Sequence, residues 1–320
     1  MSTLIVIVNY RTADLTVDCL RSLRDEVQAL PDTKVVVTDN QSGDDSPAQI
    51  QNAIEQNNWS SWATLMPLER NGGFAYGNNQ AIQPALDGDT PPEFVLLLNP
   101  DTVIRQGAVA SLIKFMRDNP NIGIAGSRLE DPDGTPQRSA FRFPSIRSEL
   151  DDGLRLGIIS RLLRNKSVAP PVRDDTYQTD WVAGASMIVR QEVFNDAGLM
   201  DDGYFMYYEE VDFCLRANRA GWPCWYVPES KVVHLVGQAS GVTVQNTRPK
   251  RRPDYWFDSR RRYFVKNHGR LCALMTDAVF ALGYATYRLR RLVQRKPDTD
   301  PPKLLYDFIR HSVLLKGAKV

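Results

Sequence analysis

The sequence predicts an α/β fold with a largely parallel central sheet, flanking helices and a helical C-terminal extension. Short apolar runs such as 4–8, 34–38 and 94–98 alternate with segments of helical spacing, which is the pattern of successive βαβ units. The run 94–98 is apolar at every position, as expected of a strand buried on both faces of a parallel sheet. At 320 residues the chain can form one such domain and an appendage.

Strand and helix alternate through the first half of the chain. In chain order we expect strand 4–8, helix 12–30, strand 34–38, helix 47–56, strand 64–68, a helix ending near 86, strand 94–98, helix 106–119 and strand 122–125. Leu15, Cys19 and Leu23 give the first helix its period, and Pro31 follows its end. Pro100 cannot continue strand 94–98, because proline donates no ladder hydrogen bond.

The second half is less regular. In chain order we expect a short amphipathic helix over 153–164, a strand over 181–190, a helix over 191–197, a helix beginning near Glu209 and short strands over 225–227 and 231–233. The stretch 128–179 fits a surface excursion at least as well as an acceptor-binding lid.

A charge asymmetry suggests a division at residue 247. From Arg248 onward 18 Lys and Arg face 6 Asp and Glu, whereas the preceding residues hold 21 basic and 32 acidic side chains. We therefore expect a domain over 1–247 and a basic helical extension over 248–320. Apolar residues from Leu271 to Val293 keep helical spacing and arginines follow, so this helix lies either on an anionic membrane surface or against the first domain or a second subunit, as in a homodimer.

The composition of the chain indicates its cellular compartment and excludes some classes of partner. Cys19, Cys214, Cys224 and Cys272 lie far apart without a CxxC pair, which suits a reducing compartment and argues against a disulfide scaffold or structural zinc. We expect a cytoplasmic protein, without a signal peptide or a clear membrane span. The basic residues form no nucleic-acid motif, so nucleic acid is not an expected partner.

Polar residues follow three strands at the point where each strand ends. These are Asn9, Asp39 and the pair Asn99 and Asp101. The carboxyl ends of parallel strands share one edge, which binds the ligand in open α/β sheets, so helix capping alone explains them poorly. The loop 71–73, Asn-Gly-Gly, precedes a helix N-terminus suited to an anion. It is neither a Walker loop nor a dinucleotide fingerprint.

A carboxylate cluster and a histidine are further candidates for functional residues. Glu209, Glu210 and Asp212 fall in the first turn of a helix, where the dipole favours carboxylates. Aromatic residues within 204–208 could wall a semi-apolar cleft around them, and crowded carboxylates there would have the raised proton affinity of a general base.

His234 ends a strand before a loop with Gly237, Ser240 and Gly241. A single histidine after a strand is commonly structural, but its position at a loop gives more weight to a functional role.

Seven motifs in order resemble family 2 of the glycosyltransferases, most closely its rhamnosyltransferase-like bacterial members that build cell-surface polysaccharides. They are Val-Asn-Tyr-Arg (8–11), Thr-Asp-Asn-Gln-Ser (38–42), Asn-Gly-Gly-Phe-Ala-Tyr-Gly-Asn-Asn (71–79), Leu-Asn-Pro-Asp (98–101), Gly-Ala-Ser-Met (184–187), Glu-Glu-Val-Asp-Phe-Cys-Leu-Arg (209–216) and His234. The resemblance spans about residues 3–265 and is weaker for the substrate than for the family.

The resemblance implies a GT-A fold and an inverting transfer from a nucleotide sugar to a hydroxyl of a glycan or lipid-linked acceptor. dTDP-rhamnose is the leading donor, with UDP-sugars close behind. A divalent cation, Mn²⁺ or Mg²⁺, is implied as well, and a nitrogen ligand beside oxygens would favour Mn²⁺.

Matching positions assign roles to individual residues. Asp39 would contact the nucleotide base or ribose. Asp101 is the last residue of the family's Asp-x-Asp metal motif, whose first position here is Asn99, and His234 would complete the metal site. Glu210 occupies the position of the base. The predicted donor-binding residues are Asn9, Arg11, Asp39, Asn71, Gly72, Gly73, Asn99 and Asp101.

The family's base is the second residue of a Glu-Asp pair, and glutamate there adds a methylene, so Glu209 or Asp212 could hold the role instead.

Two other functions are alternatives. Sugar-nucleotide pyrophosphorylases resemble one another in a Gly-rich, basic loop directly after the first strand, whereas residues 9–12 of this chain are Asn-Tyr-Arg-Thr. A non-catalytic nucleotide-sugar-binding protein would keep the fold and lose the reaction.

Overall fold

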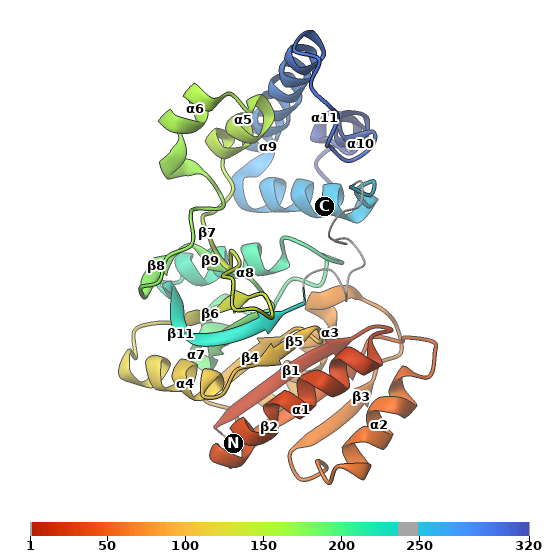
Figure 1. Cartoon of the computed structure of the whole chain (residues 1–320), viewed down its shortest axis with the longest axis vertical. Helices are drawn as coiled ribbons and strands as arrows, with labels where there is room; N and C mark the ends of the chain where they lie inside the picture. The colour runs from red at the N-terminus through yellow and green to blue at the C-terminus, as the bar shows by residue number, and fades with distance from the viewer. Residues whose placement is uncertain (1, 236–248, 320) are drawn as a thin grey trace. The chain divides into compact units, whose positions relative to one another are not determined.

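A computed structural model describes residues 2–235 and 249–319, which divide into two compact units (Figure 1). The described part of the first, the sheet unit, comprises 2–141, 171–205 and 209–235. That of the second, the helical unit, comprises 142–170, 206–208 and 249–319. The division expected at residue 247, and the loop through Gly237, Ser240 and Gly241, lie outside the described residues.

A nine-stranded sheet forms the centre of the sheet unit, in the order β3-β2-β1-β4-β10-β6-β11-β5, with β8 paired to β11. Its strands are β1 (Thr3–Asn9), β2 (Thr33–Asp39), β3 (Ala63–Pro67), β4 (Phe94–Leu98), β5 (Thr102–Ile104), β6 (Ile124–Glu130), β8 (Tyr177–Thr179), β10 (Ser186–Arg190) and β11 (Cys224–His234). The pairs β1–β2, β1–β4, β2–β3 and β6–β11 are parallel, while β5, β8 and β10 pair antiparallel. The predicted, largely parallel sheet is confirmed.

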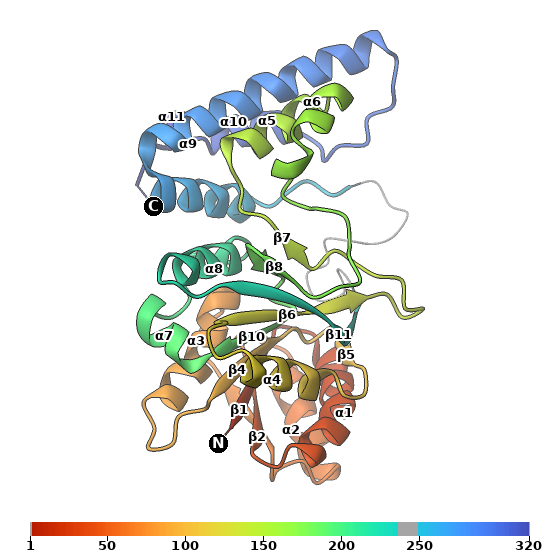
Figure 2. The same cartoon turned by 90° about the vertical axis from the view of Figure 1, so that its left-hand side faces the viewer.

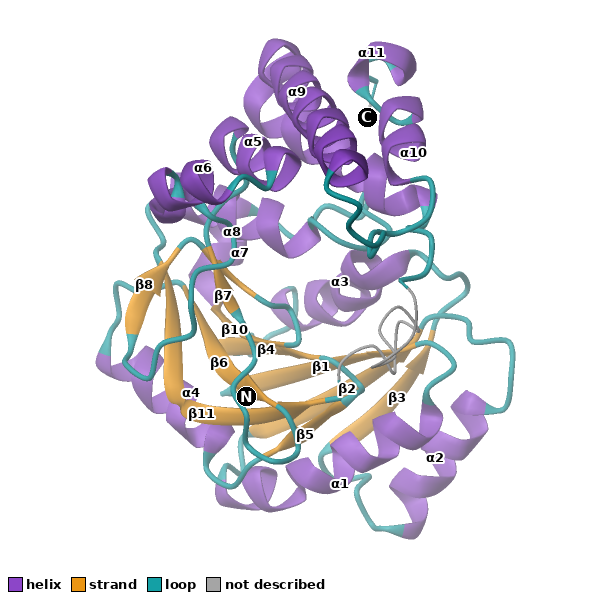
Figure 3. Cartoon of the chain, turned by 45° about the horizontal axis from the view of Figure 1, so that its top comes forward, coloured by secondary structure: helices purple, strands orange, loops and turns teal. Residues whose placement is uncertain are grey.

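Helices cover both faces of the sheet, because the strands are apolar on both sides. Helices α1 (Ala13–Ala29), α2 (Ser46–Gln56) and α4 (Ala108–Asp118) lie on one face, and α3 (Gly73–Leu86) and α8 (Glu209–Arg219) on the other (Figure 3). Side chains of β1, β2 and β4 pack with α1, α2 and α4 into one core. A short helix α7 (Gln191–Ala197) follows β10, and β7 (Ala140–Phe141) pairs separately with β9 (Trp181–Val182).

A buried carboxylate fastens α1 to the start of α4. Glu26 of α1 is 6% exposed and accepts hydrogen bonds from the backbone N–H groups of Gly107, Val109 (3.0 Å) and Ala110 (3.3 Å). These N–H groups have no partner inside their own helix, and the positive end of the helix dipole favours the carboxylate.

We expect Glu26→Ala to lower the free energy of unfolding by about 2–4 kcal/mol, because it leaves buried N–H groups without acceptors. Thermal and urea unfolding would measure the loss. Glu55→Ala, an exposed substitution on α2, is the matched control and should change stability by less than about 0.5 kcal/mol. Equal unfolding midpoints for the two variants would contradict a capping role.

Several expected elements are wrong in their bounds. The helix expected over 153–164 is two helices, α5 (Ile146–Leu154) and α6 (Gly157–Leu162), because Arg155 takes a φ of +48° and ends α5. The strand expected over 181–190 is interrupted between β9 and β10.

Three further corrections concern the sheet. The two strands expected near the end of the domain are the single strand β11, with a register shift between Val227 and Lys231. Strand β6 begins and ends later than the expected 122–125. The three-residue strand β5 was not expected at all.

The helical unit is built around α9 (Asp254–Val293), which breaks at Gly269 with a φ of +81°. Helix α5 lies along it (Figure 2), and two glycines permit the close approach: a Cβ on Gly153 would lie 2.9 Å from the Phe280 carbonyl oxygen, and one on Gly283 3.0 Å from the Leu154 nitrogen. The unit also holds α10 (Leu304–Arg310), α11 (Val313–Lys316) and the 3₁₀ helix Arg164–Lys166.

A buried ion network joins these helices. Arg260, 3% exposed, donates to Glu149 at 2.7 Å and to Asp277 at 2.6 Å. Asp277 also accepts the Val313 N–H at 2.7 Å, so α5, α9 and α11 share one cluster of charges. Within the described residues, no helix is both long and apolar enough to cross a membrane.

Candidate active site

The ends of β1 and β2 form the first part of the site. Asn9 and Asp39 are paired in the parallel register, and Asn9 Nδ2 donates to Asp39 Oδ2 at 2.6 Å. Ser42 donates to the same carboxylate through its hydroxyl (2.6 Å) and its N–H (3.0 Å). Asn9 is fully buried, and its amide oxygen accepts from Thr12 and Thr16. Asn9 therefore fixes the Asp39 carboxylate in place.

Hydrogen bonds connect two further groups of predicted donor-binding residues, Arg11 and the loop 71–73, to this cluster. Arg11 donates from its backbone N–H to Ser42 Oγ (2.9 Å) and from Nε to the Ser42 carbonyl (2.8 Å). Asn40, next to Asp39, donates to the Gly73 carbonyl at 2.8 Å, and the Asn71 side chain accepts the Gly73 N–H at 3.1 Å. Asn40 was not among the expected site residues, although its place beside Asp39 could have indicated it.

Gly73 shows why the loop needs glycine. Its φ is +87°, and a Cβ there would lie 1.8 Å from the Phe205 carbonyl oxygen, which itself accepts the Phe74 N–H at 3.0 Å. Any side chain at residue 73 would push the chain ahead of α8 away from the start of α3.

An antiparallel strand pair brings together the two expected metal ligands. His234 at the end of β11 is paired with Thr102 at the start of β5, and the Leu235 N–H donates to the Asp101 carbonyl at 2.9 Å. His234 Nε2 consequently lies 3.5 Å from Asp101 Oδ1. Gln137 donates to the His234 carbonyl at 2.9 Å and holds this end of β11.

The candidate metal ligands Asp101 and His234 are of types that suit a divalent cation. Asp101 is 3% exposed, and among the described residues the buried Nδ1 of His234 has no hydrogen-bond partner. No group of three or more His, Cys, Asp or Glu side chains in the described ranges could hold a metal. A carboxylate and an imidazole leave the other coordination positions to substrate phosphates, as is usual for Mg²⁺ and Mn²⁺ in phosphate-binding sites.

Glu210, at the start of α8, lies near the same edge. A Cβ on Gly184 would lie 3.1 Å from the Phe74 ring and 4.0 Å from the Glu210 Cβ, so Glu210 stands over the chain just before β10. The next residue, Ala185, accepts the Asn99 N–H at 3.1 Å. Through these contacts Glu210 is placed beside the strand end that carries Asn99 and Asp101.

The three candidate bases have different surroundings. Asp212 is fully buried, accepts from Arg216 Nε at 2.8 Å and from the Tyr204 hydroxyl at 3.3 Å, and so holds α8 together. Burial raises the pKa of Glu209 well above its usual value, and the neighbouring Glu210 carboxylate raises it further. Burial also raises the pKa of Glu210, to about 7.

These surroundings separate the roles of the two glutamates. Each has one buried carboxylate oxygen without a hydrogen-bond partner among the described residues. Glu209 is 4% exposed and Glu210 is the more exposed of the two. Burial and a like charge thus raise the pKa of Glu209, while burial alone raises that of Glu210, and neighbouring carboxyl groups in different environments can take different roles.

The aromatic residues before α8 belong to two units and have different partners within them. Tyr204 is fully buried and bonded to Asp212, whereas Tyr207 stacks on Tyr255 and Tyr208 packs against Tyr263 within the helical unit. Tyr207 and Tyr208 both take a φ of +68°, a conformation that costs about 1–3 kcal/mol per residue away from glycine.

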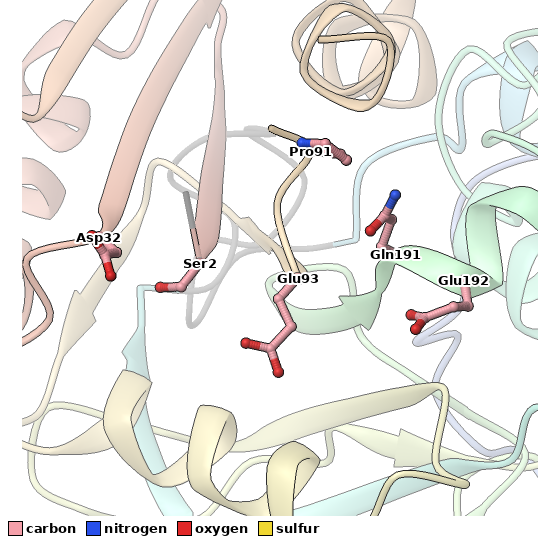
Figure 4. Close-up of a pocket in the computed structure, with 6 residues that line it drawn as sticks. All are labelled: Ser2, Asp32, Pro91, Glu93, Gln191 and Glu192. Carbon is pink, nitrogen blue, oxygen red and sulfur yellow. The ribbon is translucent and has the colours of Figure 1, made fainter. Parts of the chain in front are cut away.

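A separate hollow of about 440 Å³ lies at the opposite edge of the sheet (Figure 4). Its lining includes Ser2 and Asp32, which precede β1 and β2, and Glu93, which precedes β4. None of the expected site residues lines it, and Glu93 is paired with Arg117 at 2.7 Å. The hollow is therefore distinct from the candidate site.

The fold and the site together define an α/β protein that gathers its polar residues at the carboxyl ends of parallel strands. The chain belongs to glycosyltransferase family 2. The family model described as Glycosyl transferase family 2 matches residues 4–177, and that described as Glycosyl transferase family group 2 matches residues 94–291. The predicted family and enzyme class are confirmed.

The chain is also similar to individual proteins whose names state a more specific activity than the family does. The chain is 29% identical over 221 residues to N-acetylglucosaminyl-diphospho-decaprenol L-rhamnosyltransferase of Mycobacterium tuberculosis, covering 65% of this chain and 68% of that protein. It is 31% identical over 170 residues to rhamnosyltransferase WbbL of Escherichia coli, covering 51% and 60%. It is also similar to dTDP-rhamnosyl transferase RfbF of Shigella flexneri, at 26% identity over 228 residues, covering 69% and 70%.

Solved structures share the fold at low identity. The mannosyltransferase PcManGT of Pyrobaculum calidifontis, in complex with GDP-Man and Mn²⁺, has a TM-score of 0.57 at 14% identity, over 99% of this chain and 81% of that one. TarS 1–349 of S. aureus in complex with UDP-GlcNAc has a TM-score of 0.56 at 14% identity, over 97% and 79%. The expected GT-A-like fold is confirmed.

Proposed function

We propose that the chain is an inverting transferase that moves a sugar from a nucleoside-diphosphate donor to a hydroxyl group of a glycan or lipid-linked acceptor. Rhamnose is the leading sugar, supported by the names of the three bacterial relatives, and a dTDP- or UDP-sugar is the donor class. A lipid-linked acceptor is supported by the decaprenol in the name of the mycobacterial relative.

One observation supports this function most directly: three kinds of chemistry meet at one edge of the sheet. Asp39, held by Asn9 and Ser42, is an anchored acceptor for the hydroxyl or N–H groups of a nucleoside. The loop 71–73 leads into the N-terminus of α3, where a diphosphate is favoured. Asp101 with His234, and Glu210, then supply the cation site and the base.

The reaction follows from these positions. Glu210 accepts the proton of the acceptor hydroxyl, whose oxygen attacks the anomeric carbon from the face opposite the nucleotide. The bond between that carbon and the diphosphate oxygen breaks, and the nucleoside diphosphate departs with the electron pair. Asp101 and His234 would hold Mn²⁺ or Mg²⁺, which supplies positive charge beside the departing diphosphate. The raised pKa of Glu209 favours its neutral form, which adds less repulsion beside Glu210 than a second carboxylate would.

Thermal-shift titration with dTDP-, UDP- and GDP-sugars, each with Mn²⁺, with Mg²⁺ and with EDTA, tests the proposal. We expect one donor class, foremost dTDP-rhamnose, to raise the unfolding temperature only in the presence of metal, because ligands that bind the folded state stabilise it by mass action. Product formation from that donor with a lipid-linked acceptor would then establish transfer. Binding without transfer or donor hydrolysis would favour the non-catalytic alternative.

A further inference from the structure

The outer face of α9 carries an unusual apolar stripe. Between Leu271 and Val293, every exposed residue of the helix is apolar except Thr286. The members of this α9 stripe are Leu271, Leu274, Met275, Ala278, Leu282, Ala285, Leu289, Leu292 and Val293. Leu271, Leu282 and Val293 are 71%, 70% and 77% exposed, so these side chains protrude at both ends and in the middle of the stripe.

The spacing puts the whole stripe on one side of the helix. Its members recur at intervals of three and four residues for six turns, within roughly a third of the helix circumference. The opposite side is covered inside the helical unit, where Phe280 packs on Phe308 with ring centroids 4.3 Å apart and Gly283 lies against α5. Burial within this unit therefore accounts for one side of α9 only.

Charge indicates what the stripe contacts. Over residues 142–170, 206–208 and 242–320, the ranges of the helical unit, the sequence has 24 Lys and Arg against 9 Asp and Glu. No acidic residue occurs between Asp277 and Asp298, while five basic residues do: Arg288, Arg290, Arg291, Arg295 and Lys296. Arg291 is buried and pairs with Asp298, as does Arg288, so Arg295 and Lys296 are the exposed cations of this segment. An apolar stripe on a strongly basic unit matches a bilayer surface with anionic headgroups, which attracts each nearby Lys or Arg by about 1 kcal/mol.

We propose that α9 lies in the plane of an anionic lipid surface, with the α9 stripe among the acyl chains and exposed cations such as Arg295 and Lys296 at the headgroups. The intervals of four and three residues from Leu271 to Leu292 also suit a coiled coil. A second copy is disfavoured, because it would bring two strongly basic units together and offers no carboxylate between 278 and 297 to the arginines of its partner.

Vesicle co-sedimentation of the full chain, without donor or acceptor, tests this inference independently of the sugar transfer. We expect binding to phosphatidylcholine vesicles with 30% phosphatidylglycerol, weaker binding to pure phosphatidylcholine, and a further decrease as salt rises. The neutral double substitution Leu282→Gln/Leu289→Gln should lower partitioning at least about tenfold, because it removes two exposed apolar side chains and leaves the charge unchanged. Thr286→Leu completes the stripe and should raise partitioning.

The following outcomes would overturn the inference. Unchanged partitioning of the double variant, or equal binding to both vesicle types, would contradict an anionic surface that takes up the stripe. A dimer of the full chain in light scattering, dissociated by the same double substitution, would assign the stripe to a second copy. Circular dichroism verifies that the variants remain folded, which we expect because Leu282 and Leu289 are 70% and 65% exposed.

Discussion

Replacing Glu210 by glutamine is expected to lower the rate of sugar transfer roughly 10²–10⁴-fold while donor binding is largely kept. Glutamine preserves the size of the side chain above Gly184 but cannot accept a proton from the acceptor hydroxyl. The measurement is steady-state transfer, paired with thermal-shift titration of the donor. Near-normal turnover in Glu210→Gln would remove this residue from the role of base.

The neighbouring glutamate provides the matched control. Because burial and the Glu210 carboxylate raise the pKa of Glu209 and favour its neutral form, Glu209→Gln is a nearly neutral replacement and should cost less than about tenfold. If Glu209→Gln showed the larger loss, the two roles would be exchanged. Asp212→Asn is a poor control, since it breaks the buried pair with Arg216.

A pH profile tests the same assignment. Only the ionised form of Glu210 can act as a base, and burial raises its pKa to about 7. The rate of the native chain should therefore increase with pH through about 7 and level off above it. That acidic limb should disappear from the residual activity of Glu210→Gln, whereas a limb set by the acceptor would persist.

The second large effect is expected from Asp101→Asn. The substitution is nearly isosteric and removes the one anionic side chain of the proposed cation site, so metal-dependent stabilisation by the donor should be lost. Transfer should fall by roughly 10²–10³-fold, the scale of several kcal/mol of charge stabilisation. Thermal shift with and without Mn²⁺ measures the first effect separately from activity.

Two variants set the comparison for Asp101→Asn. His234→Ala removes the neutral ligand of the pair and should weaken the metal response less. Asp133→Asn, in an exposed turn of the same unit, should leave it unchanged. A native metal response in Asp101→Asn would mean that the cation is held elsewhere.

The first half of the fold could be predicted from sequence because local pattern determines it. Strands such as Phe94–Leu98 are buried on both faces, and their apolar runs are bounded by Asn, Asp and Pro. The same reasoning located Asn9, Asp39 and Asp101, since residues at the ends of parallel strands share an edge. The ion pair of Asp212 with Arg216 could also have been predicted, because Arg216 follows it at the i+4 spacing of helical ion pairs.

What sequence could not supply was decided by contacts between distant segments. Strand β5 has three residues and exists through pairing with β11, so its own sequence carries little signal. The helix boundary at Arg155 depends on a left-handed residue that is not glycine. The separate environments of Glu209 and Glu210 likewise follow from packing, because the two are identical in type and adjacent in the chain.

The β5–β11 pairing also affects how the enzyme matures. Asp101 and His234 become neighbours only after β11 has joined the sheet, so the proposed cation site is absent from a nascent chain that ends before residue 234. Contacts between segments so far apart in sequence form slowly, because a long loop must close first. During synthesis the pair Asn9 and Asp39, the proposed nucleotide contact, can therefore assemble before the proposed cation site, and catalytic competence would be acquired only after residue 234 has been added to the chain.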